Sequence, residues 1–306
     1  MIINIRKKFH KICQSVWTIG FVETSLGDII DGKPLKIKWV EVPSDCWYAD
    51  PFILDVTDKE IALLVEEWSY VLERGVISKI VIERKTNRVI HKKQLLQLDT
   101  HLSFPVIYRK EGEIYVSPEN SESGGLHLYK YNSSDESLTY LNCICKSALT
   151  DAIIADLWGR KFLFSTLRET ANGNTLHVFH WDETSKLYEP SSMITFQENI
   201  ARNAGHFFEY NGVKYRPAQV CNTAYGQAIS MQEIKKIDDG IVMKEVGRLY
   251  STHKRLINGM HTFNYSQGVI VVDAWGWKAP FLRRLFVDDW GNVKGWVQKF
   301  SNFGRK

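Results

Sequence analysis

The chain has 306 residues, of which 44% are hydrophobic, 24% are charged and 12% are aromatic. This composition is typical of a globular protein and excludes a disordered chain, a collagen and a heptad array. The 39 Lys and Arg residues barely exceed the 35 Asp and Glu residues, so the charge predicts no nucleic-acid partner. The cysteines form an odd, scattered set, which argues against a disulfide framework and favours a reducing compartment. They are Cys13, Cys46, Cys143, Cys145 and Cys221.

The start of the chain carries a basic segment, residues 1–16, with four Lys or Arg side chains between positions 6 and 11. Gln14, Ser15 and Thr18 interrupt the apolar stretch that follows, which disfavours a signal peptide. No apolar run approaches the roughly 20 residues that span a bilayer, so we expect no transmembrane segment. We predict a cytoplasmic protein whose basic segment can contact an anionic membrane surface peripherally.

Five segments of the chain share one plan: a short apolar strand, a turn rich in Gly, Asp or charge, and a second apolar strand that ends in a polar group. Equivalent positions in these repeats are separated by 54, 47, 54 and 55 residues, the length of a four-stranded propeller blade. These positions are Pro51, Pro105, Ala152, His206 and His261.

Residues after each hairpin alternate between apolar and polar, as in 126–131 and 175–181, which indicates two further strands per repeat. We therefore predict an all-β fold, a five-bladed β-propeller, formed by residues 17–306 as a single domain. The strand at 17–22 precedes the first repeat, and residues 295–300 end the last one. Pairing of the N-terminal strand into the final blade would close the ring and remove a free sheet edge.

In a propeller, the first strand of every blade lines the central axis, so the residues that begin these strands converge. The sequence places there Asp50, His101, Ser103, Asp151, Arg202, His206 and His261. A second ring of polar residues ends the second strands and consists of Glu66, Glu119, Thr166, Gln219 and Asp273. We interpret both rings as a solvated funnel. The alternative is that they cap turns at strand ends.

This inventory fits carbohydrate chemistry. Paired carboxylates across a pocket can divide the general-acid and general-base roles when their environments separate their pKa values. Aromatic side chains near the predicted mouth can stack on a sugar ring, and packing between blades is their alternative role. These are Trp47, Tyr48, Trp68 and Trp275.

We expect no metal and no cofactor. His101, His206 and His261 could bind a divalent metal with Asp50 or Asp151, but pocket histidines without a metal are commoner. Cys143 and Cys145 lack the second cysteine pair of a structural zinc site.

The segment Ala49–Ile53 resembles the first-blade motif of five-bladed furanosidase-type enzymes such as glycoside hydrolase family 43. The resemblance implies that Asp50 is a general base and that Asp151 tunes its pKa and orientation. The fourth-blade motif departs from the pattern, because Ala204 stands where the family has its acidic Glu. Ordinary hydrolysis is therefore in doubt.

A second resemblance covers nearly the whole chain. Seven short motifs follow one another in the order found in the N-terminal propeller domain of plant glucosamine inositolphosphorylceramide transferases, and the chain is also similar to bacterial stand-alone relatives associated with surface-polysaccharide assembly. The motifs are residues 17–20, 49–52, 101–105, 118–120, 215–219, 225–226 and 260–262. The third blade departs from the pattern, with Asp151-Ala152 in place of Asp-Pro. The resemblance implies the propeller fold and, more loosely, a role in sugar or glycoconjugate biosynthesis.

The leading hypothesis is a protein of glycan, surface-polysaccharide or glycolipid biosynthesis that binds a sugar or glycoconjugate in the central pocket and transfers it. Asp50 is the candidate base, Asp151 its electrostatic partner and Glu119 the candidate acid. The candidate substrate ligands are His101, Ser103, Arg202, His206, Arg216, Gln219, His261, Glu66 and Asp273. Two alternatives stay open: a furanosidase-type glycoside hydrolase, and a non-catalytic sugar-binding module that serves a partner glycosyltransferase.

Overall fold

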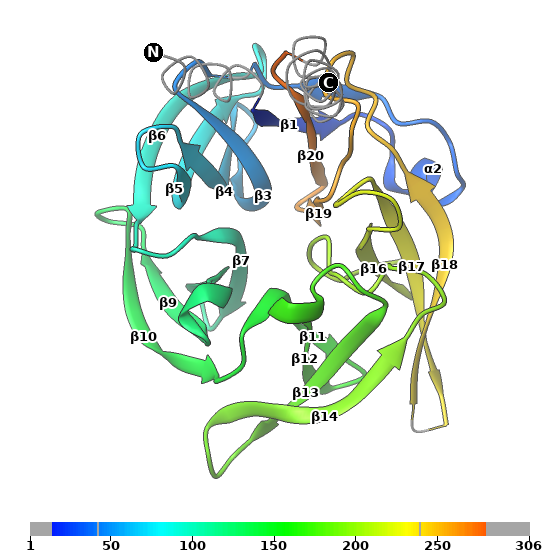
Figure 1. Cartoon of the computed structure of the whole chain (residues 1–306). Helices are drawn as coiled ribbons and strands as arrows, with labels where there is room; N and C mark the ends of the chain where they lie inside the picture. The colour runs from blue at the N-terminus through cyan, green and yellow to red at the C-terminus, as the bar shows by residue number, and fades with distance from the viewer. Residues whose placement is uncertain (1–13, 42, 239, 280–306) are drawn as a thin grey trace, which may run out of the picture.

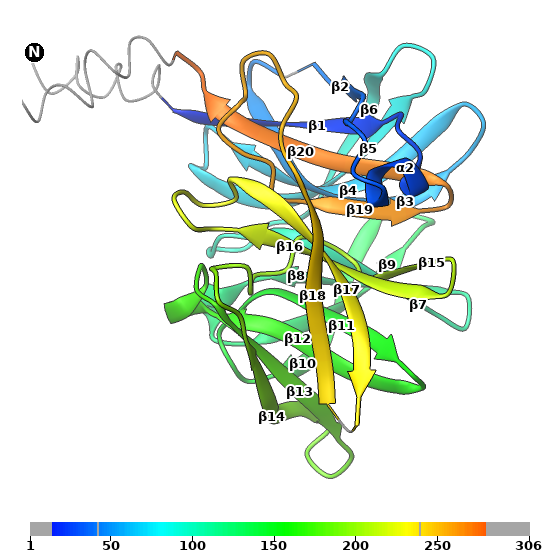
Figure 2. The same cartoon turned by 90° about the vertical axis from the view of Figure 1, so that its right-hand side faces the viewer.

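The computed structural model describes residues 14–41, 43–238 and 240–279. Five antiparallel four-stranded sheets surround a central axis (Figure 1). This arrangement confirms the predicted five-bladed β-propeller. The side view shows the twisted sheets edge-on, with β1 and β20 side by side (Figure 2).

The first four blades follow the chain without interruption, and in each of them the strands are hydrogen-bonded in sequence order. Blade one contains β3 (Cys46–Val56), β4 (Glu60–Ser69), β5 (Arg74–Glu83) and β6 (Arg88–Leu96). Blade two contains β7 (Ser103–Lys110), β8 (Glu113–Glu119), β9 (Leu126–Asn132) and β10 (Ser137–Cys145). Blade three contains β11 (Leu149–Leu157), β12 (Arg160–Leu167), β13 (Thr175–Asp182) and β14 (Leu187–Thr195). Blade four contains β15 (Phe208–Tyr210), β16 (Val213–Val220), β17 (Ala228–Ile237) and β18 (Gly240–Leu249).

Blade five joins the two halves of the chain. It pairs β19 (Phe263–Ser266) and β20 (Val269–Trp277) with β1 (Ser15–Val22) and β2 (Ile37–Trp39), in the order β19-β20-β1-β2. Trp17 lies opposite Trp275 in this pairing. Closure of the ring by the N-terminal strand is thus confirmed. The strand expected at residues 295–300 lies outside the described residues.

Large apolar side chains fill the space between the blades. Phe52, Phe104 and Phe164 come from three different blades, and all are fully buried in one cluster. The rings of Phe52 and Phe104 meet edge to face, with centroids 4.9 Å apart. Burying a side chain of this size stabilises the fold by about 1.5–3 kcal/mol. This packing explains why the aromatic content of the chain is high.

The inner strands of the first three blades carry an irregularity at the same place. The pairing of β3 with β4 shifts between Ala49 and Phe52, and β7 and β11 shift at the corresponding points. Asp50, Phe104 and Asp151 occupy these shifts with φ of 50°, 45° and 48°. A bulge of this kind redirects a side chain and is frequent near functional sites. The strained backbone costs on the order of 1–3 kcal/mol per residue, so the surroundings must hold it in place.

A few short helices accompany the strands. The α-helix α2 (Leu26–Ile30) begins at Ser25, whose side chain accepts a hydrogen bond from the Asp28 backbone N–H. Two 3₁₀ turns, Ser121–Ser123 and Arg168–Thr170, follow β8 and β12. No helix in the described ranges has the length and apolar character needed to cross a membrane.

The cysteines that the structure describes are all free thiols: Cys46, Cys143, Cys145 and Cys221. For these four, the expectation that the chain has no disulfide framework is confirmed. Cys13 lies outside the described residues.

Candidate functional site

A cavity of about 350 Å³ opens between the first and last blades, at the end of the axis where β1 and β3 begin. Its walls are mostly aromatic, and blades five and one supply all five tryptophans. The lining residues are Gln14, Ser15, Trp17, Trp47, Glu66, Trp68, His101, Tyr225, His261, Trp275 and Trp277. Three of the four aromatic residues that the sequence placed near the mouth line this pocket. The fourth, Tyr48, is buried in the apolar cluster of the first blade instead.

The tryptophans form a continuous wall. The rings of Trp47 and Trp68 stack with centroids 5.4 Å apart and an interplanar angle of 6°. Trp17 lies 5.7 Å from Trp275, which meets Trp277 edge to face at 5.6 Å. Such packing holds the indole faces rigidly, and rigid aromatic faces are typical walls of small-ligand sites.

The polar floor of the pocket includes Glu66 and His101. The backbone N–H of Gly75 donates to His101 Nδ1 at 3.0 Å, so the ring proton of neutral His101 resides on Nε2. That atom lies 3.5 Å from Glu66 Oε1. Burial lowers the pKa of His101. Burial, followed by the charges of Asp50 and Glu119, raises the pKa of Glu66 well above its ordinary value.

Gly75 makes this approach possible. A Cβ atom on Gly75 would lie 2.4 Å from the Leu102 carbonyl oxygen and 2.7 Å from both Glu66 Oε1 and His101 Cε1. Only a glycine leaves room for the acid and the imidazole at this strand position.

His261 forms another part of the floor. Its ring stacks on Trp17 with centroids 4.1 Å apart, and Tyr225 meets it edge to face at 5.3 Å. Nδ1 of His261 lies 2.6 Å from Asp273 Oδ2 and 3.7 Å from Asp50 Oδ1. Burial alone would lower the pKa of His261, but the charges of Asp273 and Asp50 raise it.

Asp50 lies beneath the pocket, buried between three blades. Its Oδ2 accepts the backbone N–H of Phe104 at 3.0 Å, and its Oδ1 accepts the hydroxyl of Thr262 at 2.7 Å. Burial raises the pKa of Asp50 to about 6, although the charge of His261 opposes this shift.

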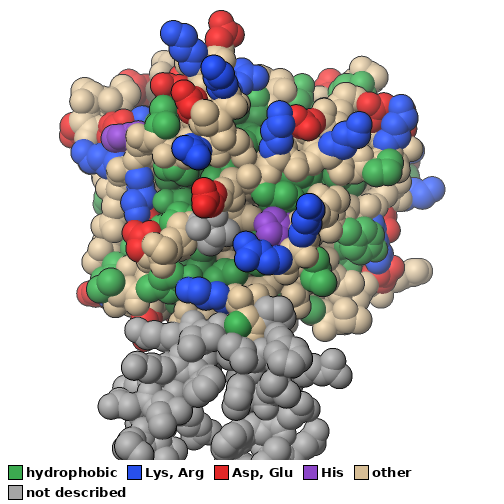
Figure 3. All heavy atoms as spheres, turned by 90° about the horizontal axis from the view of Figure 1, so that it is seen from above, with side chains coloured by type: hydrophobic (Ala, Val, Ile, Leu, Met, Phe, Trp, Pro, Cys, Tyr) green, Lys and Arg blue, Asp and Glu red, His purple; other side chains and the backbone are tan. Residues whose placement is uncertain are grey.

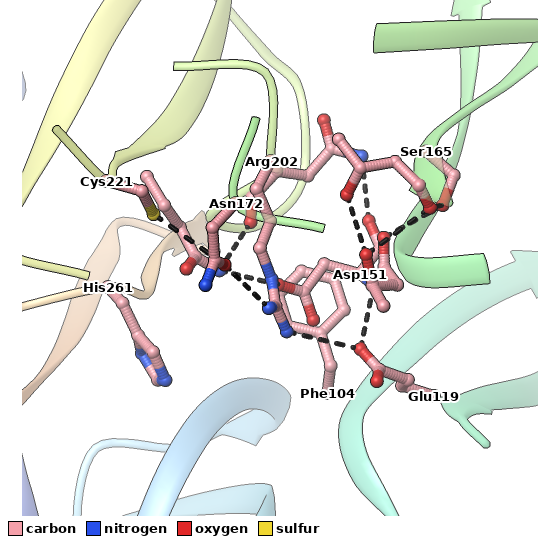
Figure 4. A network of polar contacts seen from close by, with 12 residues as sticks. Phe104, Glu119, Asp151, Ser165, Asn172, Arg202, Cys221 and His261 are labelled. Carbon is pink, nitrogen blue, oxygen red and sulfur yellow. Dashed lines mark hydrogen bonds and ion pairs between the residues drawn. The ribbon is translucent and has the colours of Figure 1, made fainter. Parts of the chain in front are cut away.

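Asp151 and Glu119 form a second buried group around Arg202 (Figure 4). Arg202 Nε donates to Asp151 Oδ2 at 2.6 Å, and Arg202 Nη2 lies 3.5 Å from Glu119 Oε2. Gln219 also donates to Asp151 Oδ2, at 2.5 Å. Burial and the charge of Asp151 raise the pKa of Glu119 to about 8. The ring of Tyr225 lies under the Arg202 guanidinium, 4.9 Å from centroid to Cζ, so this group borders the pocket from below.

The axial carboxylates also join neighbouring blades. Asp273 accepts the backbone N–H of Asp50, and Asp50 accepts that of Phe104. Glu119 accepts the backbone N–H of Asp151 at 2.9 Å. Each of these N–H donors belongs to a bulged residue with positive φ, so the acid of one blade satisfies the strained backbone of the next. A structural role therefore accounts for much of the convergence of acids that the sequence predicted.

The second polar ring is drier than expected. Thr166, Gln219 and Asp273 are fully buried, and among the described members of the ring Glu66 is the one that lines the pocket. The prediction of a solvated funnel is wrong for these three residues. The alternative interpretation, in which these residues cap strand ends through hydrogen bonds, describes the three residues better.

The structure does not bring six of the nine proposed ligands to the pocket lining: Ser103, Arg202, His206, Arg216, Gln219 and Asp273. Arg216 is fully buried within blade four and donates to Asn203, Gln232 and the carbonyl oxygens of residues 200 and 201. His206 packs edge to face on Phe52 at 5.2 Å, and burial lowers its pKa to about 4. Ser103 is buried at the start of β7, opposite Glu119.

Several lining residues escaped the sequence reasoning, notably Trp17, Tyr225 and Trp277. Trp17 lies in the strand that closes the ring, and Tyr225 follows β16 in a loop. Both belong to short motifs that the sequence analysis quoted for the fold alone. Their presence in those motifs is the signal that could have identified them as pocket residues.

Asp50, His261 and Asp273 place one ligand-type atom each within 4.8 Å of one another, a spacing that a divalent cation can bridge. The short Nδ1–Oδ2 contact requires a proton on His261 Nδ1. Metal binding at that nitrogen would require the loss of this proton. Neither His101 nor His206 belongs to this group, so among the described residues the three histidines considered from the sequence do not form one metal site.

A second cavity of about 380 Å³ lies in the groove between the first two blades, lined among others by Asp55, Lys79, Arg109 and Tyr131. None of the site residues predicted from the sequence lines it. The aromatic pocket is therefore the better candidate for the functional site.

Comparison with known proteins places the chain in a family. The family model described as "Glucosamine inositolphosphorylceramide transferase 1, N-terminal" matches residues 36–264. The chain belongs to this family. The resemblance inferred from the seven motifs is thus confirmed.

Two plant members illustrate the relationship. Glucosamine inositolphosphorylceramide transferase 1 of Arabidopsis thaliana is 32% identical over 143 residues, which cover 44% of this chain and 19% of the relative. The protein of the same name from Oryza sativa subsp. japonica is 26% identical over 149 residues, or 45% of this chain and 19% of the relative. The matched part thus spans about a fifth of the length of these family members.

Solved structures show the same fold at low identity. The GH43_1 enzyme from Xanthomonas citri, complexed with xylose, has a TM-score of 0.52 and 10% identity over 76% of this chain and 87% of its own. RS223-Beta-xylosidase has a TM-score of 0.50 and 10% identity over 76% of this chain and 93% of its own. These likenesses confirm the glycoside hydrolase family 43-like propeller and nothing about activity.

Proposed function

We propose that this chain is a carbohydrate-binding propeller of glycolipid or surface-glycan biosynthesis, and that the aromatic pocket holds one sugar ring of its ligand. The observation that carries the proposal is the combination of a tryptophan wall with a polar floor of Glu66, His101 and His261. The wall offers faces for the C–H groups of a sugar, and the floor offers donors and acceptors for its hydroxyl groups.

The protonation states of the floor support a neutral polyhydroxyl ligand. Burial raises the pKa of Glu66 and so favours its protonated form, which can both donate and accept a hydrogen bond. His101 has a lowered pKa and presents the Nε2 proton that the Gly75 contact assigns to it. Both residues can therefore bind hydroxyl groups without placing a net charge against the ligand.

A titration of the full chain tests binding. Glucosamine, its neutral N-acetyl form and inositol phosphate are suitable probes, because the plant relatives are named for a glucosamine inositolphosphorylceramide. Calorimetry and tryptophan fluorescence would measure affinity for the wild type, Trp68→Ala and Glu66→Gln. We expect saturable binding of at least one probe and a loss of about tenfold or more in Trp68→Ala, as removal of a packed aromatic anchor typically produces. The loss in Glu66→Gln should be smaller, because the Gln amide can also donate and accept hydrogen bonds.

The matched control is Trp158→Ala. Trp158 is 43% exposed in the turn between β11 and β12 of blade three, whereas the pocket tryptophans belong to blades five and one. Its affinity should equal that of the wild type. Absence of binding to a broad sugar panel, or binding that survives both pocket substitutions, would contradict the proposal.

A second candidate function is transfer or hydrolysis of the sugar in the same pocket. The pKa of Asp50 near 6 and that of Glu119 near 8 favour it, because an ionised base and a protonated acid would coexist at neutral pH. Ala204 counts against ordinary family 43 hydrolysis. It is fully buried in an apolar cluster, where a Glu side chain would find no solvent.

A screen of nucleotide sugars and activated arylfuranosides tests this second candidate. Product release in the wild type and its loss in Asp50→Asn would support turnover, with Asp50 as base and Asp151 as its partner. Turnover that Asp50→Asn leaves unchanged would remove Asp50 from the mechanism. Binding without product would favour the non-catalytic module, for which a partner glycosyltransferase and a cytoplasmic location stay predictions.

A further inference from the structure

The lining of the aromatic pocket contains no Lys or Arg among the described residues, although basic side chains outnumber acidic ones in the chain. Lys and Arg side chains lie instead on surfaces such as the outer face of blades five and one, where Figure 3 shows them among acids and apolar groups. The lining supplies six aromatic rings of Trp and Tyr, two imidazoles and one carboxyl group, that of Glu66. A ligand in this pocket therefore meets π faces and a carboxyl group rather than arginine or lysine.

Carboxyl groups outnumber bases at and beneath the floor of the pocket. His261 forms an ion pair with Asp273 at 2.6 Å, and Arg202 forms one with Asp151 at 2.6 Å. Apart from neutral His101, these two are the basic side chains that contact the acids of the floor within the described ranges, and Figure 4 shows both. Burial raises the pKa of the three remaining acids, and the charges of neighbouring acids add to each shift. These three acids are Asp50, Glu66 and Glu119.

Glu66 is the acid that lies beside the tryptophan wall. Glu66 and Trp68 are two residues apart on β4, so their side chains lie on the same face of the strand. Trp47 pairs with Trp68 across β3 and β4, and the two rings stack with centroids 5.4 Å apart. Glu66 Oε1 lies 3.5 Å from Nε2 of His101, whose ring centroid is 5.8 Å from that of Trp68. A carboxyl group and stacked indole rings thus share one corner of the cavity.

The face of an indole ring attracts a cation, and a carboxylate beside it adds a charged acceptor. From the aromatic lining and the unmatched acids we infer that the pocket recognises an ammonium group of its ligand, held between the tryptophan wall and Glu66. The inference rests on the proposed function for the place of the ligand and adds the charge that the ligand carries. The protonated form of Glu66 before binding is compatible with it, because a cation beside a carboxyl group favours the ionised form.

Two sources can supply such a group: a sugar with a free amine, and a quaternary amine such as choline. The cavity of about 350 Å³ has room for either of them. Both would place a cation against the indole rings, whereas an anionic group in the same place would be repelled by the acids of the floor. The two sources are therefore compared in separate arms of one experiment.

Calorimetry of the full chain with pairs of ligands that differ mainly in charge tests the inference. Glucosamine is paired with glucose, and choline is paired with 3,3-dimethyl-1-butanol, in which a carbon atom replaces the ammonium nitrogen. The measurements are made at about pH 6, where amines are protonated. We expect the ammonium member of at least one pair to bind about tenfold more tightly than its neutral partner, as a desolvated cation–π contact produces. Inositol phosphate should bind more weakly than inositol.

Two substitutions should weaken the preference for charge. Glu66→Gln keeps the size of the side chain without its charge, and Trp68→Leu keeps an apolar wall without its π face. In each variant, the ratio of the two affinities within the discriminating pair should fall to about threefold or less. Glu60→Gln and Trp158→Leu are the matched controls, because Glu60 is exposed at the other end of β4 and Trp158 belongs to blade three. Both controls should keep the ratio of the wild type.

Equal affinities within both pairs, or tighter binding of inositol phosphate than of inositol, would overturn the inference and leave the proposed sugar binding standing wherever a sugar binds. A ratio that neither Glu66→Gln nor Trp68→Leu changes would also overturn it. If a variant fails to fold, the ligand pairs on the wild type still decide.

Preference for glucosamine identifies an amino sugar as the source of the ammonium group. Preference for choline with no binding of any sugar supports the inference and contradicts the proposed function alone. Absence of binding by every probe contradicts both.

Discussion

Nδ1 of His261 lies 2.6 Å from Oδ2 of Asp273, and the two residues belong to the hairpin that completes the ring. Asp273 Oδ1 also accepts the backbone N–H groups of His261 and Thr262, and its Oδ2 accepts the N–H of Asp50 from blade one. One buried carboxylate therefore supports the stacked imidazole in the pocket and the contact that joins the last blade to the first. The pocket and the ring closure depend on the same ion pair.

The first prediction concerns this ion pair and pH. The raised pKa of His261 means that its contribution to stability is complete below the ordinary pKa of 6.5 and is lost as pH rises through the folded value. The pKa of Asp273 is lowered by His261 and by hydrogen bonds despite burial, so its contribution is lost as pH falls below 3.8. The pair should stabilise the fold most between these limits.

Urea unfolding from pH 4 to pH 9 measures this dependence. Asp273→Asn should lower the free energy of unfolding at pH 6 by about 3 kcal/mol, as expected when one member of a buried pair is removed. His261→Gln should make the decline on the alkaline side smaller and leave the part that the raised pKa of Glu66 produces. A decline of the same size in His261→Gln would show that another group titrates.

A second prediction concerns Glu66. Because its pKa is raised in the folded state, the unfolded chain releases this proton first as pH rises, and stability falls from about pH 4.3 upward until the folded carboxyl also ionises. Glu66→Gln cannot ionise and should be more stable than the wild type at pH 8 and equal to it at pH 4. Denaturant midpoints at the two pH values check this. Lower stability of the variant at pH 8 would mean that the carboxylate is charged and paired.

A third prediction concerns Gly75. Its replacement by Ala would push a methyl group against Glu66, His101 and the Leu102 carbonyl. Sugar affinity should fall about tenfold or more, because a displaced floor no longer presents both polar groups to one ligand. Gly247→Ala is the control, since a Cβ at Gly247 meets no atom within 4 Å. Equal sugar affinities of the two variants, measured by calorimetry, would show that the pocket floor does not contribute to ligand binding.

A fourth prediction separates structure from function at Arg216. Its guanidinium is fully buried and bonds to the segment that begins blade four. Arg216→Met should cost about 3 kcal/mol of stability, because it leaves several carbonyl and amide oxygens without donors. The sugar affinity of the folded protein should stay within about twofold of the wild type. A large loss of affinity in a variant of normal stability would restore Arg216 as a ligand.

The fold was accessible from the sequence because its signals are local. Alternation of apolar and polar residues reports a strand directly, and five units at near-equal spacing report a closed ring of blades. The closing role of residues 17–22 follows from the same logic, since a ring without that strand would leave an open edge.

Only part of the site could be predicted from the sequence. Asp50 and Glu66 were predicted because each occupies a strand-end position that is equivalent between the repeat units. Glu66 lines the pocket, whereas Asp50 lies beneath its floor. Arg216 and Gln219 were both assigned to the pocket, although residues three apart on a strand point to opposite faces. Gln219 meets Asp151, whereas Arg216 enters the blade.

The five-bladed ring and the family could be predicted from the order of residues, because strand alternation and motif order are properties of the chain read one residue after another. Packing of the blades in the folded protein sets which polar groups face the ligand pocket and which join the blades. That choice depends on bulges at Asp50, Phe104 and Asp151 and on the burial of each carboxyl, and both arise only when blades distant in sequence pack together.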